Sequence, residues 1–100
     1  MMEFNVRLTK SSKEDLERLF EFLAANDLDA ALRARAAIEK GYEFLEQMPF
    51  ACRKATEDNA FLRELIIPFG SAGYVALFEI EADNVVTILA IRHQREEDYH

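Results

Sequence analysis

The strongest strand pattern of the chain is GYVALFEIEADNVVTILAIR, which spans residues 73–92. It contains two runs rich in β-branched and aromatic residues, Gly73 to Glu81 and Val85 to Arg92, around the turn-forming Ala82-Asp83-Asn84. This pattern predicts two strands joined by a tight hairpin. A third run of the same kind, Phe61 to Ile67, comes shortly before them. Because short connections join antiparallel strands, the three runs predict an antiparallel meander.

Upstream of these strands the hydrophobic period becomes that of helices. The segment Ser11-Ser12-Lys13-Glu14 is a capping box, which predicts the start of an amphipathic helix. A second helix is predicted from about Asp29 to Met48, with Asp27 or Asp29 as its N-cap and Pro49 as its end. The short linker predicts an antiparallel helical hairpin. Gly41 marks either a close approach of the two helices or a tolerated defect.

The remaining segments complete an α+β architecture. Phe4, Val6 and Leu8 alternate with polar residues, which predicts a half-buried N-terminal strand, whereas the polar stretch from Pro49 to Asn59 predicts a loop. The expected domain covers residues 1–100: an N-terminal strand, then an antiparallel helical hairpin packed on one face of a mainly antiparallel sheet, in the order β-α-α-β-β-β. Both faces of the later strands carry apolar residues, so we expect something further to pack on the second face.

Composition narrows the class of protein. The chain has 100 residues, half of them apolar and 31% charged, which suits one ordinary globular domain. Its single cysteine, Cys52, excludes an intrachain disulfide and, with no base partner evident, predicts an ordinary thiol. The longest apolar run, Tyr74 to Phe78, is too short to span a membrane, and the N-terminus lacks the apolar stretch of a signal peptide. We therefore expect a cytoplasmic protein, and its net charge of −7 argues against non-specific nucleic-acid binding.

Short segments occur along the chain in a characteristic order and spacing: Val6-Arg7-Leu8-Thr9, Asp15-Leu16, Ala30-Ala31, Ile38, Leu45, Pro49, Arg63-Glu64-Leu65, Gly73-Tyr74-Val75 and the last strand from Val85 to Glu96. Together they resemble the RelE/ParE family of toxins from bacterial type II toxin–antitoxin systems. The ending Arg92-His93-Gln94-Arg95 of the last strand looks like the ParE branch of that family.

The resemblance implies a RelE/ParE-like toxin domain in a plasmid stabilisation or addiction system, neutralised by a cognate antitoxin of the ParD type. It also implies a homodimer or a toxin–antitoxin hetero-oligomer. ParE-type members poison DNA gyrase by binding, whereas RelE-type members cleave messenger RNA on the ribosome with the RNA's own 2′-hydroxyl as nucleophile. A third alternative is a member that binds its antitoxin and is no longer toxic. No cofactor, metal, membrane or direct DNA contact by the toxin alone is expected.

The sequence departs from the nuclease branch at positions that carry charge. The nuclease branch has an arginine directly after the Gly-Tyr pair, where this chain has Val75. It has a further arginine at the position of Gln94 in this chain, although a one-residue shift would place Arg95 there. Cleavage of RNA needs proton-transfer groups and cations around the phosphate. The missing cations therefore favour gyrase inhibition over nuclease activity.

The resemblance also implies which residues are functional. Arg92, His93, Arg95 and Tyr99 are expected to bind the target, with Arg63 as a second-tier candidate; in a nuclease, Arg63, His93, Arg95 and Tyr99 would be catalytic. The residues themselves leave simpler alternatives open. A basic-then-acidic tail is typical of a solvated terminus with weak ion pairs, and Arg63 could equally form a surface ion pair. His93 has no cysteine or carboxylate at metal-ligand spacing, so no metal site is expected.

Overall fold

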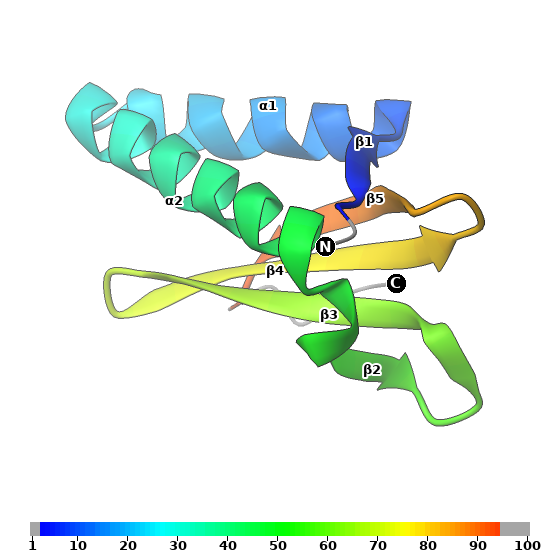
Figure 1. The fold of residues 1–100 in the computed structure, drawn as a ribbon. Coiled ribbons are helices and arrows are strands. Elements are labelled where there is room, and N and C mark those ends of the chain that lie inside the picture. The colour runs from blue at the N-terminus through cyan, green and yellow to red at the C-terminus, as the bar shows by residue number, and fades with distance from the viewer. Residues whose placement is uncertain (1–2, 95–100) are drawn as a thin grey trace.

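The computed structural model describes residues 3–94 as two layers, a pair of helices on one face of a five-stranded sheet (Figure 1). The expected α+β architecture with its helical hairpin is confirmed. In chain order the elements are β1 (Asn5–Leu8), α1 (Lys10–Ala24), α2 (Leu28–Gln47), the short 3₁₀ helix η1 (Pro49–Ala51), β2 (Arg53–Thr56), β3 (Asn59–Phe69), β4 (Ala72–Glu81) and β5 (Val85–His93).

The sheet has the order β1-β5-β4-β3-β2, so the first and last strands of the chain are neighbours. β1 runs parallel to β5, and every other pair is antiparallel. The predicted hairpin between β4 and β5 is present: Glu81 pairs with Val85, and the turn between them places Asp83 and Asn84 at φ values of 63° and 58°. Aspartate and asparagine tolerate this left-handed conformation better than other non-glycine residues.

The prediction of a loop between Pro49 and Asn59 is wrong. This segment forms η1 and the edge strand β2, which pairs with β3, and β3 begins at Asn59 instead of Phe61. The sequence of β2 is Arg-Lys-Ala-Thr, and it is largely exposed. A polar edge strand buries no face and therefore shows no apolar alternation, although charged edges are a usual protection against unwanted pairing.

The capping box expected at Ser11 is also not used. Thr9 caps α1, because its side-chain oxygen accepts a hydrogen bond from the Ser12 amide at 3.1 Å. The hydroxyl of Ser12 donates to the Thr9 carbonyl at 3.0 Å and is buried. Thr9 is held in place by β5, since its amide donates to the Ile88 carbonyl. For α2, Asp27 is the N-cap, one of the two residues proposed.

The hydrophobic core lies between the helices and the sheet. Its largest buried side chains include Leu45 of α2, Tyr74 and Phe78 of β4, and Ile88 and Ile91 of β5. We call this side of the sheet the helix-covered face and the other side the far face.

Gly41 of α2 lies against this core. A methyl group there would lie 3.1 Å from side-chain atoms of Leu65 and Ile67. The sequence left open a close approach to the other helix or a tolerated defect; the close approach is in fact to strand β3.

Helix α1 closes the edge of β5 that lies beyond β1. β1 pairs with β5 only as far as Leu8, opposite Ile88. On that side of β5, the backbone beyond Ile88 has no strand partner. The carboxylate of Asp15 accepts a hydrogen bond from the Ile91 amide at 3.0 Å. A buried amide without a partner is costly, so Asp15 stabilises the docking of α1 onto the sheet.

Candidate functional site

The predicted target-binding residues lie at the end of β5, and the structure separates the two that it describes. Arg92 is opposite Val75, which faces away from the helices. His93 points to the helix-covered face, where its ring contacts Tyr74 edge-on with a centroid separation of 5.6 Å. Consecutive residues of a strand point to opposite sides. Arg92 and His93 therefore do not converge on one point, and the other two candidates, Arg95 and Tyr99, lie outside the described residues.

Arg63 faces the helix-covered side at the β2 edge, where it binds backbone groups. Its Nη1 donates to the carbonyls of Phe50 and Cys52 at 3.1 and 2.7 Å, and its Nε donates to the carbonyl of Ala60 at 2.7 Å. The guanidinium also lies over the Phe50 ring, 5.4 Å from its centroid. The surface ion pair of this segment is formed instead by Arg53 and Glu64, at 3.0 Å.

Cys52 has the environment of an unreactive thiol. Burial raises the pKa of the Cys52 thiol, and the nearby charge of Arg63 opposes this shift without overcoming it. A thiol with a raised pKa holds little thiolate at neutral pH and is a poor nucleophile. Among residues 3–94, no three His, Cys, Asp or Glu side chains gather where a metal ion could bind, and no described helix is long and apolar enough to cross a membrane.

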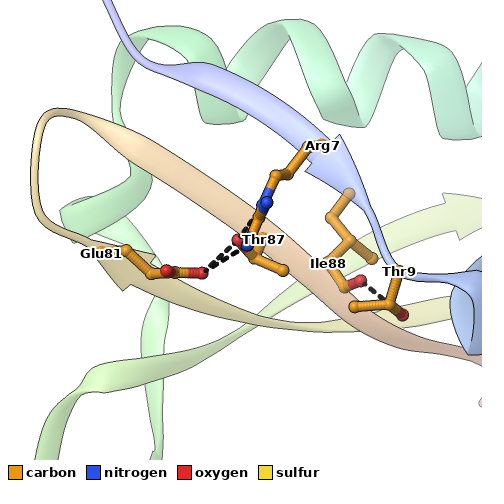
Figure 2. A network of polar contacts seen from close by, with 5 residues as sticks. All are labelled: Arg7, Thr9, Glu81, Thr87 and Ile88. Carbon is orange, nitrogen blue, oxygen red and sulfur yellow. Dashed lines mark hydrogen bonds and ion pairs between the residues drawn. The ribbon is translucent and has the colours of Figure 1, made fainter.

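A polar network on the far face joins three strands (Figure 2). Arg7 of β1 donates from Nε to the Thr87 hydroxyl at 2.9 Å and forms an ion pair with Glu81 of β4 at 3.5 Å. The Thr87 hydroxyl in turn donates to the Glu81 carboxylate. Because Thr87 is buried and both donates and accepts, the network ties the parallel edge strand to the sheet and offers no activated nucleophile.

The far face is only partly apolar. Ile66 is exposed, whereas Val75 retains only 6% of its accessible surface. Leu62 and Leu77 are half-buried, and Glu64 and Glu79 share this face with them. The expected apolar second face is thus a mixed surface within the described part of the chain.

Two apolar depressions lie elsewhere. The first is a groove of about 280 Å³ between α1 and α2, floored by Tyr74 and lined by Leu16, Leu19, Phe20, Leu23, Ala31, Ala34 and Ile38, with Lys13, Glu17 and Arg35 at its rim. The second, which we call the phenylalanine hollow, has a volume of about 590 Å³ and is lined by Phe4, Phe50, Phe61, Ile80 and the turn residues Glu81 to Asn84. Reasoning from the sequence missed both, because each depends on how separate elements pack against one another.

Comparisons with known proteins agree with the architecture. A family model described as "ParE toxin of type II toxin-antitoxin system, parDE" matches residues 6–98. Toxin RelE1 of Caulobacter vibrioides is 30% identical over 84 residues, which cover 84% of this chain and 87% of that protein.

Two solved structures share the fold. A chain of the chromosomal ParDE toxin–antitoxin system from P. aeruginosa matches with a TM-score of 0.72 at 17% identity, over 91% of this chain and 96% of that chain. A chain of the toxin–antitoxin complex RelBE2 from Mycobacterium tuberculosis matches with a TM-score of 0.61 at 21% identity, over 92% and 99% of the two chains.

A helical hairpin packed on one face of this five-stranded sheet is thus the fold of the RelE and ParE toxins. Because the ParE model covers nearly the whole length, the chain belongs to the ParE family of type II toxin–antitoxin toxins, within the wider RelE/ParE group.

Proposed function

We propose that this chain inhibits DNA gyrase by direct binding in the cytoplasm, without a chemical step of its own, and that a ParD-type antitoxin neutralises it. The observation that carries this proposal is the position of Arg63. Three backbone carbonyls hold its guanidinium against η1 and β2. A cation committed in this way is poorly placed to stabilise a phosphorane during RNA cleavage, which requires donors aimed at the reacting phosphate.

The arrangement at the end of β5 also supports binding over catalysis. General acid–base chemistry needs its groups within hydrogen-bond reach of one reacting centre. Arg92 and His93 point to opposite faces, and the residue opposite Arg92 is the apolar Val75. The end of β5 can still present the cation of Arg92 and the imidazole of His93 to a protein partner. Arg95 and Tyr99 are further proposed contacts.

An antitoxin partner is supported by the groove between α1 and α2. Its lining is almost wholly apolar, and its rim carries Lys13, Glu17 and Arg35. An amphipathic helix that places apolar side chains in a groove is a common mode of peptide recognition. We therefore propose that a helix of the antitoxin covers this groove in a hetero-oligomeric complex.

The first test is a gyrase supercoiling assay with the purified chain, without antitoxin. We expect loss of supercoiling together with accumulation of cleaved DNA. The Arg92→Ala variant should weaken inhibition by about tenfold, which corresponds to the loss of one charged contact in an interface. Arg33→Ala is the matched control, since Arg33 is exposed and pairs with Asp29 on α2.

Unaffected gyrase in the presence of folded protein would contradict the proposal. RNA cleavage during coupled translation would then indicate the RelE-type activity. If growth also continues when the chain alone is induced, the protein is a non-toxic module that binds its antitoxin.

A further inference from the structure

The phenylalanine hollow gathers aromatic residues from three separate segments. Phe4 precedes β1, Phe50 lies in η1 and Phe61 lies in β3. Their rings meet edge to face, with centroid separations of 6.4 Å between Phe4 and Phe50 and 6.1 Å between Phe50 and Phe61. Phe50 and Phe61 nevertheless keep 49% and 53% of their surface exposed. Aromatic rings gathered in this way and left half in water offer an apolar contact surface to a partner.

The backbone holds this surface in one arrangement. The Phe4 amide donates to the Glu46 carbonyl at 2.8 Å, and the next amide, of Asn5, donates to the Asn84 carbonyl at the same distance. Phe50 is fixed by Arg63, which binds its carbonyl and lies over its ring. A partner would therefore meet rings that are already ordered, and ordering them would cost little on binding.

The hollow has one exposed carboxylate at its rim. Of its two acidic lining residues, Glu81 is paired with Arg7 and Thr87 on the far face, which leaves Asp83, and none of the described lining residues is a lysine or arginine. Asp83 is exposed at the tip of the β4–β5 turn. Aromatic faces attract cations, and nearby carboxylates add to that attraction. The complementary ligand is therefore a cationic side chain on an apolar stem, with apolar neighbours.

We infer that the phenylalanine hollow binds a segment of the antitoxin in which an arginine or lysine is flanked by apolar side chains. This inference rests on the proposed antitoxin partner and adds a second contact, apart from the groove between the helices. A second copy of this chain is a poor occupant, because a two-fold contact would join two hollows that each have the carboxylate of Asp83 and no lysine or arginine among their described lining residues. Nucleic acid is disfavoured by the same carboxylate.

The chemistry can be tested without the antitoxin by titrating the ¹⁵N-labelled chain with two peptides, acetyl-Leu-Arg-Leu-amide and acetyl-Leu-Gln-Leu-amide. We expect the arginine peptide to shift the amide resonances of Phe61, Ala82 and Asp83 and to bind at least about threefold more tightly, the size of one exposed charge contact. Asp83→Asn should remove that preference, and asparagine suits the positive φ at this position. Asp58→Asn, in the exposed turn between β2 and β3, is the control and should behave as wild type.

The second arm measures calorimetric binding of the cognate antitoxin. Phe61→Ala and Asp83→Asn should weaken it by about tenfold and threefold, and Phe22→Ala, which removes a more exposed ring from α1, should leave it unchanged. Equal binding of the arginine and glutamine peptides, or wild-type antitoxin affinity in both variants, would overturn the inference. If both variants bind the antitoxin as tightly as wild type, the inference about the hollow fails, but the proposal of an antitoxin partner still stands. If the wild-type chain binds no antitoxin, the proposed partner and this inference fail together, and the peptide titration still shows whether the hollow accepts a cation.

Discussion

The two ends of the helix-covered face use aromatic residues in opposite ways. At one end Tyr74 contacts Phe69 and His93, with ring centroids 6.0 and 5.6 Å away, and is only 2% exposed beneath the groove between α1 and α2. At the other end Phe50 and Phe61 are held in place yet stay about half exposed. The helices cover the first end more completely than the second.

This difference separates stability from recognition. Burying an aromatic side chain contributes several kcal/mol to folding, whereas an exposed ring contributes little until a partner covers it. Charged side chains border both ends: Lys13, Glu17 and Arg35 lie around the groove, and the exposed Asp83 lies at the rim of the phenylalanine hollow.

The largest expected effect comes from truncating one aromatic residue at each end. Tyr74→Ala should lower the free energy of unfolding by about 3–5 kcal/mol, because it leaves a cavity in the core. Phe61→Ala should lower it by about 1 kcal/mol or less, because half of that ring already contacts water. Urea denaturation followed by circular dichroism measures both values. Similar losses in the two variants would show that the two ends do not differ in this way.

A smaller effect is expected when the support of the exposed end is removed. Arg63→Met keeps the hydrocarbon stem against Phe50 and leaves three carbonyls without this donor, so we expect a loss of about 1–3 kcal/mol in unfolding free energy. Arg53→Met is the matched control, because it breaks one ion pair, in which the Arg53 side chain is 60% exposed, and takes no donor from a backbone carbonyl; we expect it to cost about 1 kcal/mol or less. Equal thermal midpoints for the two variants would contradict a structural role for Arg63.

The smallest effect concerns Tyr42, on α2 between the two ends. Its hydroxyl is buried without a hydrogen-bond partner among the described residues, and burial, with a contribution from Glu39, raises the pKa of Tyr42 to about 12. The folded state thus keeps the phenol protonated while the unfolded chain, with a pKa near 10, begins to ionise. This contribution to stability is fully present below pH 10 and is lost as the pH rises through 12.

Tyr42→Phe removes both the unpartnered hydroxyl and this titration. We expect the variant to be more stable by about 0.5–1 kcal/mol at pH 7, with its advantage increasing between pH 10 and 12. Urea denaturation at pH 7, 10 and 11.5 provides the comparison. A variant less stable than wild type at pH 7 would show that the hydroxyl has a partner.

Much of the fold was predictable from local patterns. The hairpin of residues 73–92 has strong strand residues around Asp83 and Asn84. Of the apolar stripe expected on α2, four residues are buried, Tyr42 is half-buried and Met48, at the C-cap, is exposed; the buried four are Ala31, Ala34, Ile38 and Leu45. The polar strand β2 was not predictable, because an edge strand needs no apolar face. The cap at Thr9 was missed because β5 holds that residue in position, and the competing serine at position 11 was locally just as suitable.

The candidate site shows the same limit. The resemblance to RelE/ParE toxins implied that Arg63, Arg92 and His93 act at one site. The alternation of side chains along a strand already places Arg92 and His93 on opposite faces. Only the structure shows that the Arg63 guanidinium lies against η1 and that three phenylalanines meet at one end of the sheet.

The amino-acid sequence is enough to indicate which segments are helical and which form the long strands, because these follow the period of neighbouring residues. Composition gives the net charge, and the order of short segments that resemble RelE/ParE toxins gives the family. Tertiary structure alone decided that β1 lies beside β5, that Arg7 reaches Thr87 and Glu81, and that Phe4 contacts Phe50. Such contacts join residues up to 80 positions apart. Their geometry is set by register and layer packing, which no local pattern encodes.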